Sequence, residues 1–158
     1  MNMKKIWRNL AAGFAACVLL ASCGEQNADI QVDINALAEA LDTGITYQDP
    51  LEKLDSDMIG MLYSVDGLVE ESVVYMGSGA TAEEIAVFAC NDANTAKNEV
   101  QPIVEEHVQS QIDAFSSYIP EEVAKLEDAV IRQAGKYVVL SVSNDPDGAN
   151  KIMDEYLK

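Results

Sequence analysis

Cys23 is the residue whose type and position most clearly indicate chemistry. It closes the sequence Leu-Ala-Ser-Cys at residues 20–23, after a basic start and a short apolar run at residues 10–20. This order is typical of a bacterial lipoprotein signal peptide, in which small residues admit the peptidase and the cysteine thiol is diacylated before cleavage. The sequence therefore predicts lipid attachment at Cys23 and removal of residues 1–22. The alternative is an ordinary secretory signal with a cysteine there by chance.

The apolar run is too short to span a bilayer. A helix of about 11 residues rises roughly 16 Å, against a hydrocarbon core of about 30 Å. Two acyl chains on one cysteine hold firmly, because each buried methylene contributes about 0.8 kcal/mol. We expect residues 23–31 to be a flexible tether, with a single domain at 32–158 on the extracytoplasmic face of the cell membrane.

Charge limits the partners that the mature chain can bind. Cleavage would lower Lys+Arg from 10 to 7 against 27 Asp and Glu residues, which gives a net charge of −20. Nucleic acids and anionic headgroups would repel such a protein, because phosphate binding requires clustered Lys or Arg. We therefore expect no nucleic-acid ligand. The acidity favours solubility, with a surface for cations or a basic partner as the alternative.

The cysteines predict no disulfide within the mature chain. Cys17 would leave with the signal peptide and Cys23 would be lipidated, so only Cys90 remains as a thiol. Because Cys90 lies in an apolar run, we expect it to be buried packing and not a reactive nucleophile. A domain of about 130 residues is large enough to be held by its core alone.

Acidic pairs could in principle carry out acid–base chemistry. Asp55 with Asp57, and Glu83 with Glu84, are such pairs, but a chain with 27 acids contains pairs by chance. Spacing without a pocket does not make a site. We therefore predict no catalytic residue.

Two further features resemble metal sites only weakly. Residues 143–154 place acids and a glycine as in part of a calcium loop, but Ser143 replaces the first Asp and Pro146 interrupts the loop. Simple helix capping is the favoured interpretation. His107 is the only histidine, which leaves zinc with too few ligands, and we expect it to be exposed or partly packed. We predict no metal and no cofactor.

Hydrophobic periodicity predicts the elements that position these residues. The first expected helix covers residues 34–44 and is capped by Asp33, and the second starts at Pro50. The buried residues of the second helix are expected to be Leu51, Leu54, Met58, Met61 and Leu62. A long helix is expected at 92–117 with a kink or restart at Pro102, followed by a short helical piece after Pro120 and a last helix starting at 145–146. The expected strands are 68–76, with Val69, Val73 and Tyr75 on one face, and 85–90, 129–133 and 136–143. Residues 77–79 (Gly-Ser-Gly) are expected to form a hairpin loop.

The run at 85–90 is ambiguous. Thr81 and Glu84 match a helix capping box, but the next helix starts too soon for a full helical segment to fit, so we favour a strand. Residues 91–98 and 144–151 match each other at Asn, Asp and Ala, and both follow a strand and open a helix. We expect an α+β fold: a four-stranded antiparallel sheet built from a repeated strand-strand-helix unit, with two additional N-terminal helices.

Three segments resemble a known family. They are 78–88 (Ser-Gly-Ala-Thr-Ala-Glu-Glu-Ile-Ala-Val-Phe), 118–123 (Tyr-Ile-Pro-Glu-Glu-Val) and 135–143 (Gly-Lys-Tyr-Val-Val-Leu-Ser-Val-Ser). Over nearly all of residues 33–157 the chain resembles the bacterial lipoproteins of domain-of-unknown-function family 4358. The resemblance supports a strand at Ile85, and it implies no catalytic residues. Where the family pattern has a basic residue near the end of this strand, this chain has Ala-Cys-Asn at 89–91.

Together these features predict a lipid-anchored, non-enzymatic binding or protein-interaction module, which meets a protein partner through a sheet face or loops. The alternative is a cell-envelope enzyme or cation-dependent accessory that uses clustered carboxylates. The tyrosines would form a protein-binding patch if several shared one exposed face; they are Tyr47, Tyr63, Tyr75, Tyr118, Tyr137 and Tyr156.

Overall fold

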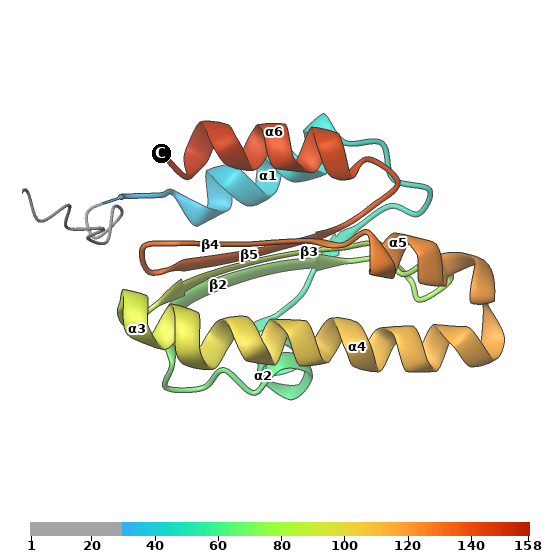
Figure 1. Cartoon of the computed structure of the whole chain (residues 1–158), viewed down its shortest axis with the longest axis horizontal. Coiled ribbons are helices and arrows are strands. Elements are labelled where there is room, and N and C mark those ends of the chain that lie inside the picture. The colour runs from blue at the N-terminus through green and yellow to red at the C-terminus, as the bar shows by residue number, and fades with distance from the viewer. Residues whose placement is uncertain (1–29) are drawn as a thin grey trace, which may run out of the picture.

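The computed structural model describes residues 30–158 (Figure 1). The predicted signal segment 1–22, the predicted acylation site Cys23 and most of the tether at 23–31 lie outside the described residues. Within the described part, no helix is both long and apolar enough to cross a membrane.

A five-stranded antiparallel sheet forms the middle layer of the domain. Its strands are β1 (Glu52–Lys53), β2 (Val69–Met76), β3 (Glu84–Cys90), β4 (Val130–Ala134) and β5 (Tyr137–Val142), in the order β1-β2-β3-β5-β4. The mixed helix and antiparallel-sheet class is confirmed, but the predicted count of four strands is wrong. The additional strand is β1, which pairs along the outer edge of β2 and sets Lys53 opposite Tyr75.

Helices cover both faces of the sheet (Figure 1). The helices α1 (Ile34–Gly44) and α6 (Pro146–Tyr156) lie on one face, and α2 (Ser56–Tyr63) and α4 (Gln101–Tyr118) lie on the other. The connecting segments are α3 (Ala93–Thr95), a π-helical turn (Ala96–Val100), a 3-10 turn (Pro120–Glu122) and α5 (Val123–Glu127). The π-helical turn directly precedes α4 and Pro102, where the sequence predicts a kink or restart.

The central strand β3 is buried along its whole length. Ile85 and Val87 pack in the core beneath α1 and α6, whereas Ala86 and Phe88 pack in the core beneath α2 and α4. A strand buried on both faces favours apolar residues on both, which explains the apolar run from Ile85 to Cys90. The predicted strand is therefore confirmed, and the competing capping box is wrong because Glu84 is the first residue of β3.

The strand-strand-helix order occurs twice, and both hairpins lie in one sheet as predicted. The two following long helices, however, lie on opposite faces: α4 packs in one core and α6 in the other. Because β3 and β5 are antiparallel neighbours, the rotation that would superpose the two hairpins has its axis perpendicular to the sheet. Such a rotation would keep both following helices on one face of the sheet. The two units therefore share their order along the chain but are not related by rotation.

The second predicted helix differs most from the structure. It begins at Ser56 and not at Pro50, because β1 occupies the residues between them, and Asp55 caps it by accepting a hydrogen bond from the Met58 N–H at 2.9 Å. The helix buries Ile59, whereas Met58 and Met61 are 44% and 74% exposed. The predicted stripe that included these two methionines is therefore wrong, because the later start changes the face that meets the sheet.

One predicted face of β2 is also partly wrong. Val73 and Tyr75 pack beneath α1 and α6, as a shared face requires, but Val69 packs with the opposite core. The pairing of β2 with β3 shifts register between Val69 and Glu71. A bulge of this kind moves the residues before it to the other side of the sheet.

The face that α2 buries leads to a stability prediction. Ile59→Ala should lower the free energy of unfolding by about 2–4 kcal/mol, because it removes buried methyl groups and leaves a cavity. Met61→Ala, two positions along the same helix, should change it by no more than about 0.5 kcal/mol. Urea unfolding followed by circular dichroism measures both. Equal losses for the two variants would contradict this placement of the helix.

Candidate functional site

Two neighbouring acids at the start of β3 carry most of the buried polar chemistry. Glu83 and Glu84 are only 1% and 2% exposed. Successive residues of a strand point to opposite faces of the sheet, so the two side chains enter separate networks. The structure therefore does not bring this predicted acidic pair together for acid–base work, although it buries both members.

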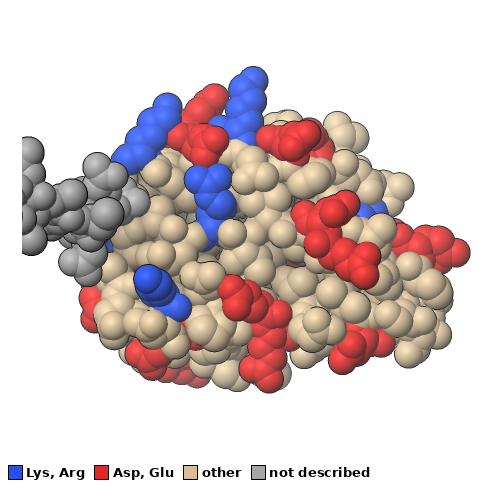
Figure 2. Space-filling model, viewed as in Figure 1, with Lys and Arg blue, Asp and Glu red and all other residues tan. Residues whose placement is uncertain are grey.

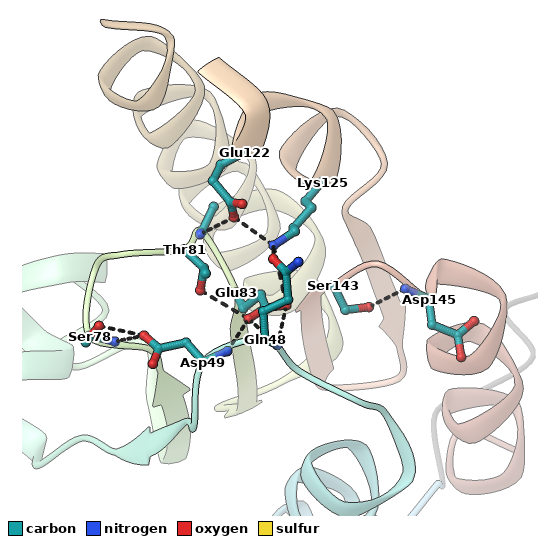
Figure 3. Close-up of polar contacts among 10 residues, drawn as sticks. Gln48, Asp49, Ser78, Thr81, Glu83, Glu122, Lys125, Ser143 and Asp145 are labelled. Carbon is teal, nitrogen blue, oxygen red and sulfur yellow. Dashed lines mark hydrogen bonds and ion pairs between the residues drawn. The ribbon is translucent and has the colours of Figure 1, made fainter. Parts of the chain in front are cut away.

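Glu83 holds the loop that follows α1. Its carboxylate accepts hydrogen bonds from the backbone N–H groups of Gln48, at 3.0 and 2.9 Å, and of Asp49, at 3.0 Å (Figure 3). The Thr81 hydroxyl donates to the same carboxylate at 3.1 Å. A carboxylate buried this deeply is tolerated because its lone pairs are used by fixed donors.

Lys125 of α5 completes this network. Its ammonium lies 3.4 Å from Glu83 Oε1, 2.8 Å from Glu122 Oε2 and 2.6 Å from Gln48 Oε1, so each of its three N–H groups has an acceptor (Figure 3). Glu122 also accepts from the Ala82 N–H at 2.8 Å. The side chains of Lys125 and Glu83 are 7% and 0% exposed. This lysine is committed to holding three segments together and is not a free nucleophile.

The predicted hairpin loop at residues 77–79 is confirmed and is attached to the same end of the sheet. Asp49 Oδ2 accepts from both the N–H and the hydroxyl of Ser78, at 2.7 and 2.6 Å (Figure 3). These hydrogen bonds, the hydroxyl first and the N–H second, lower the pKa of Asp49. Gly79 has a φ of +89°, a conformation that favours glycine.

Glu84 forms the second network, on the α2 and α4 side of the sheet. Its carboxylate accepts from the Tyr63 hydroxyl and from His107 Nε2, the latter at 2.9 Å. The ring centroids of Tyr63 and His107 are 4.3 Å apart, and the two ring planes are tilted by 35°. Burial, followed by the negative charge of Glu84, raises the pKa of Tyr63 well above its ordinary value. Two donors thus share one buried carboxylate between α2, β3 and α4.

The position of His107 corrects the sequence prediction. His107 is 8% exposed and fully engaged, not exposed or partly packed at the edge of the helix. Its partners Glu84 and Tyr63 are 23 and 44 residues away in the chain, so no local motif reveals the network. The available signal was a glutamate directly before the apolar run at 85–90, because a buried charge there must find a partner.

The remaining candidate acids lie at helix starts. Asp55 caps α2, Asp57 lies in its first turn, and Asp145 accepts from the Gly148 N–H at 2.9 Å at the start of α6. The calcium-loop resemblance at 143–154 is thus explained by capping, with Ser143 Oγ accepting from the Asp145 N–H at 3.1 Å (Figure 3). In the part of the chain that the structure describes, no group of three or more His, Cys, Asp or Glu residues is arranged to hold a metal ion.

Cys90 is buried, and the tyrosines are divided between buried and exposed positions. Cys90 is completely buried, as predicted, and burial raises the pKa of its thiol to about 12. Tyr63 and Tyr137 are buried, whereas Tyr118 at the end of α4 is 58% exposed. The tyrosines therefore do not share one exposed face.

Comparison with known proteins gives one match. A family model described as domain of unknown function (DUF4358) matches residues 45–143, which is more than half of the 158-residue chain. No curated protein matches, and no solved structure matches. The matched region contains both networks at the start of β3.

The buried lysine leads to a second stability prediction. Lys125→Met removes the ammonium but leaves Glu83 and Glu122 buried without it, and should lower the free energy of unfolding by about 3–5 kcal/mol. The matched control is Lys136→Met, which removes the ion pair of Lys136 with Glu70, whose side chains are 30% and 54% exposed. An exposed pair contributes at most about 1 kcal/mol. Chemical denaturation at neutral pH measures the difference, and similar small losses for both variants would refute a stabilising role of the network.

Proposed function

The chain belongs to the domain-of-unknown-function family DUF4358, and we propose that it is a lipid-anchored lipoprotein at the outer face of the cell membrane, whose domain binds a partner without catalysing a reaction. The observation that carries the proposal is the sequence Leu-Ala-Ser-Cys at residues 20–23 behind a basic and apolar leader. The thiol of Cys23 is the atom that would be acylated.

The start of the described domain supports a short connection to the membrane. The Val32 N–H donates to the Tyr137 hydroxyl at 3.1 Å, and Ile30 and Val32 pack against the core beneath α1 and α6. Residues 23–29 would reach at most about 25 Å when fully extended. A chain acylated at Cys23 would therefore keep its domain close to the bilayer.

The use of the buried charged side chains supports a binding role. Glu83, Glu122 and Lys125 hold loops together, and Glu84 joins three elements of the fold. Groups of the types that acid–base catalysis requires are thus committed to structure. Because helices cover both faces of the sheet, a partner would meet helices and loops, and not the sheet face that the sequence suggested. Large exposed hydrophobic side chains are present on this surface at Met58 and Tyr118.

Surface charge favours partners that are not themselves acidic. On the face shown in Figure 2, acidic side chains are spread over much of the surface, and the basic ones gather toward one side. A predominantly negative surface repels nucleic acid and anionic headgroups, which leaves the acyl chains as the means of membrane attachment. The proposed partner is therefore a protein of the cell envelope.

The anchor is tested by replacing the acylated thiol. Cys23→Ser should yield a chain with no acyl group at residue 23 and with its leader uncleaved, because cleavage by the lipoprotein peptidase follows acylation of the cysteine. Cys17→Ser, six residues earlier in the same leader, should leave acylation and cleavage unchanged. Fractionation with immunoblotting, together with mass spectrometry of the mature amino terminus, measures both. Normal cleavage of the leader in Cys23→Ser, or a Cys23 found unmodified in wild type, would overturn the anchor.

Partner binding is tested on the intact lipidated protein. Mild crosslinking in cells, followed by affinity purification from membranes, should recover the same envelope protein repeatedly with wild type and with Cys17→Ser. Cys23→Ser should lose it, because the unprocessed chain is not held at the membrane surface through acyl chains at residue 23. Failure to recover any reproducible partner would count against the binding role, and turnover of envelope polymers by the purified protein would favour an enzyme instead.

A further inference from the structure

A small cavity opens between the start of β3 and the C-terminal half of α4. It has a volume of about 90 Å³, and its lining includes Glu84, Gln111, Phe115, Tyr118, Met76 and Thr81. We propose that this cavity binds an alkylammonium group, with the Phe115 and Tyr118 rings beside the cation and the Glu84 carboxylate as its counter-ion. This inference concerns a ligand site and is independent of the lipid anchor.

The size of the cavity limits the ligand. An apolar cavity of roughly 150 Å³ accepts benzene, and a water molecule takes up about 30 Å³. A space of about 90 Å³ therefore admits a group smaller than an aromatic ring. An ammonium with its first carbon atoms fits this space.

The aromatic wall suits a cation. The rings of Phe115 and Tyr118 are stacked, with centroids 5.0 Å apart and planes 27° from parallel. Tyr118 is 58% exposed and lines the cavity. The negative face of an aromatic ring attracts ammonium groups, and aromatic side chains are the common means of binding them.

The charge of the cavity lining has the matching sign. The lining residues include Glu83 and Glu84 but no Lys, Arg or His. Glu84 is the relevant acid, because Glu83 is used by Lys125 and by the loop at 48–49. Tyr63 and His107 are both hydrogen-bonded to Glu84, and a carboxylate has about four acceptor positions, of which they use two. The carboxylate therefore retains acceptor positions for an ammonium.

An organic cation fits these walls better than a metal ion. Calcium requires six to eight oxygen ligands and magnesium nearly octahedral oxygen geometry. The cavity lining instead combines one available carboxylate with two aromatic rings and a methionine. The same ammonium chemistry has two sources: a free small amine, or the lysine side chain of a protein partner, and the second source rests on the proposed binding function.

Isothermal titration calorimetry on the mature full-length chain tests the proposal. The protein is kept in a maltoside detergent, since choline-like headgroups would compete, and in sodium chloride to screen the acidic surface. The probes are n-butylammonium, its neutral counterpart n-butanol, and a short capped peptide with one lysine. We expect saturable binding of one butylammonium per chain and no saturable binding of butanol. Tighter binding of the peptide identifies a partner's lysine as the source, and tighter binding of the free amine identifies a small molecule.

Three substitutions test whether butylammonium binds in this cavity. Tyr118→Ala changes an exposed residue, so the variant should remain folded. It should weaken butylammonium binding about 3- to 10-fold. Glu84→Gln keeps the shape of the side chain and should weaken it by at least about 10-fold. Tyr156→Ala, a tyrosine on α6 across the sheet, should leave it unchanged. Absence of saturable binding up to about 10 mM, equal binding of butanol, or binding unaffected by Tyr118→Ala would overturn the proposal. Loss of the membrane anchor or of a partner in cells would not affect this measurement, so the two proposals fail separately.

Discussion

The buried ammonium of Lys125 is the constraint on which one end of the domain depends. An ion taken out of water costs several kcal/mol unless its hydrogen bonds are satisfied. Lys125 meets this requirement only when three segments are in place together: the loop after α1 with Gln48, the start of β3 with Glu83, and the turn before α5 with Glu122. Polar contacts thus specify this end of the sheet, whereas apolar packing on two faces specifies the rest.

The same constraint determines where the neighbouring acid points. With Glu83 held by the loop at 48–49, Glu84 must face the opposite side of the sheet, toward Tyr63 and His107. A slip of one residue in the register of β3 would exchange the two glutamates and move every apolar side chain of the strand to the wrong core. A structural lysine at this end of the sheet, through its contact with Glu83, therefore helps to position the Glu84 carboxylate on the side of the sheet that carries the cavity.

The sequence predicts those parts of the fold that repeat over many residues. The amphipathic periods of α1, α4 and α6 and the apolar run of β3 identify these elements, and Asp33 and Asp145 identify two helix starts. β1 has only two residues and therefore shows no hydrophobic period in the sequence. Because the sequence does not reveal β1, the predicted start and the predicted buried face of α2 are both wrong. The polar networks join residues more than 20 positions apart, so pairs of acids adjacent in sequence were a poor guide to them.

The opposite placement of α4 and α6 separates two surfaces of the domain. The described chain begins beside α1, in the layer that α1 and α6 share, and Ile30 and Val32 belong to the core of that layer (Figure 1). The cavity, Met58 and Tyr118 belong to the α2 and α4 layer across the sheet. Had the two hairpins been related by rotation, both long helices would share one layer. The observed arrangement places the start of the described chain and the exposed hydrophobic side chains on opposite sides of the sheet, so the proposed anchor and the proposed partner surface would lie apart.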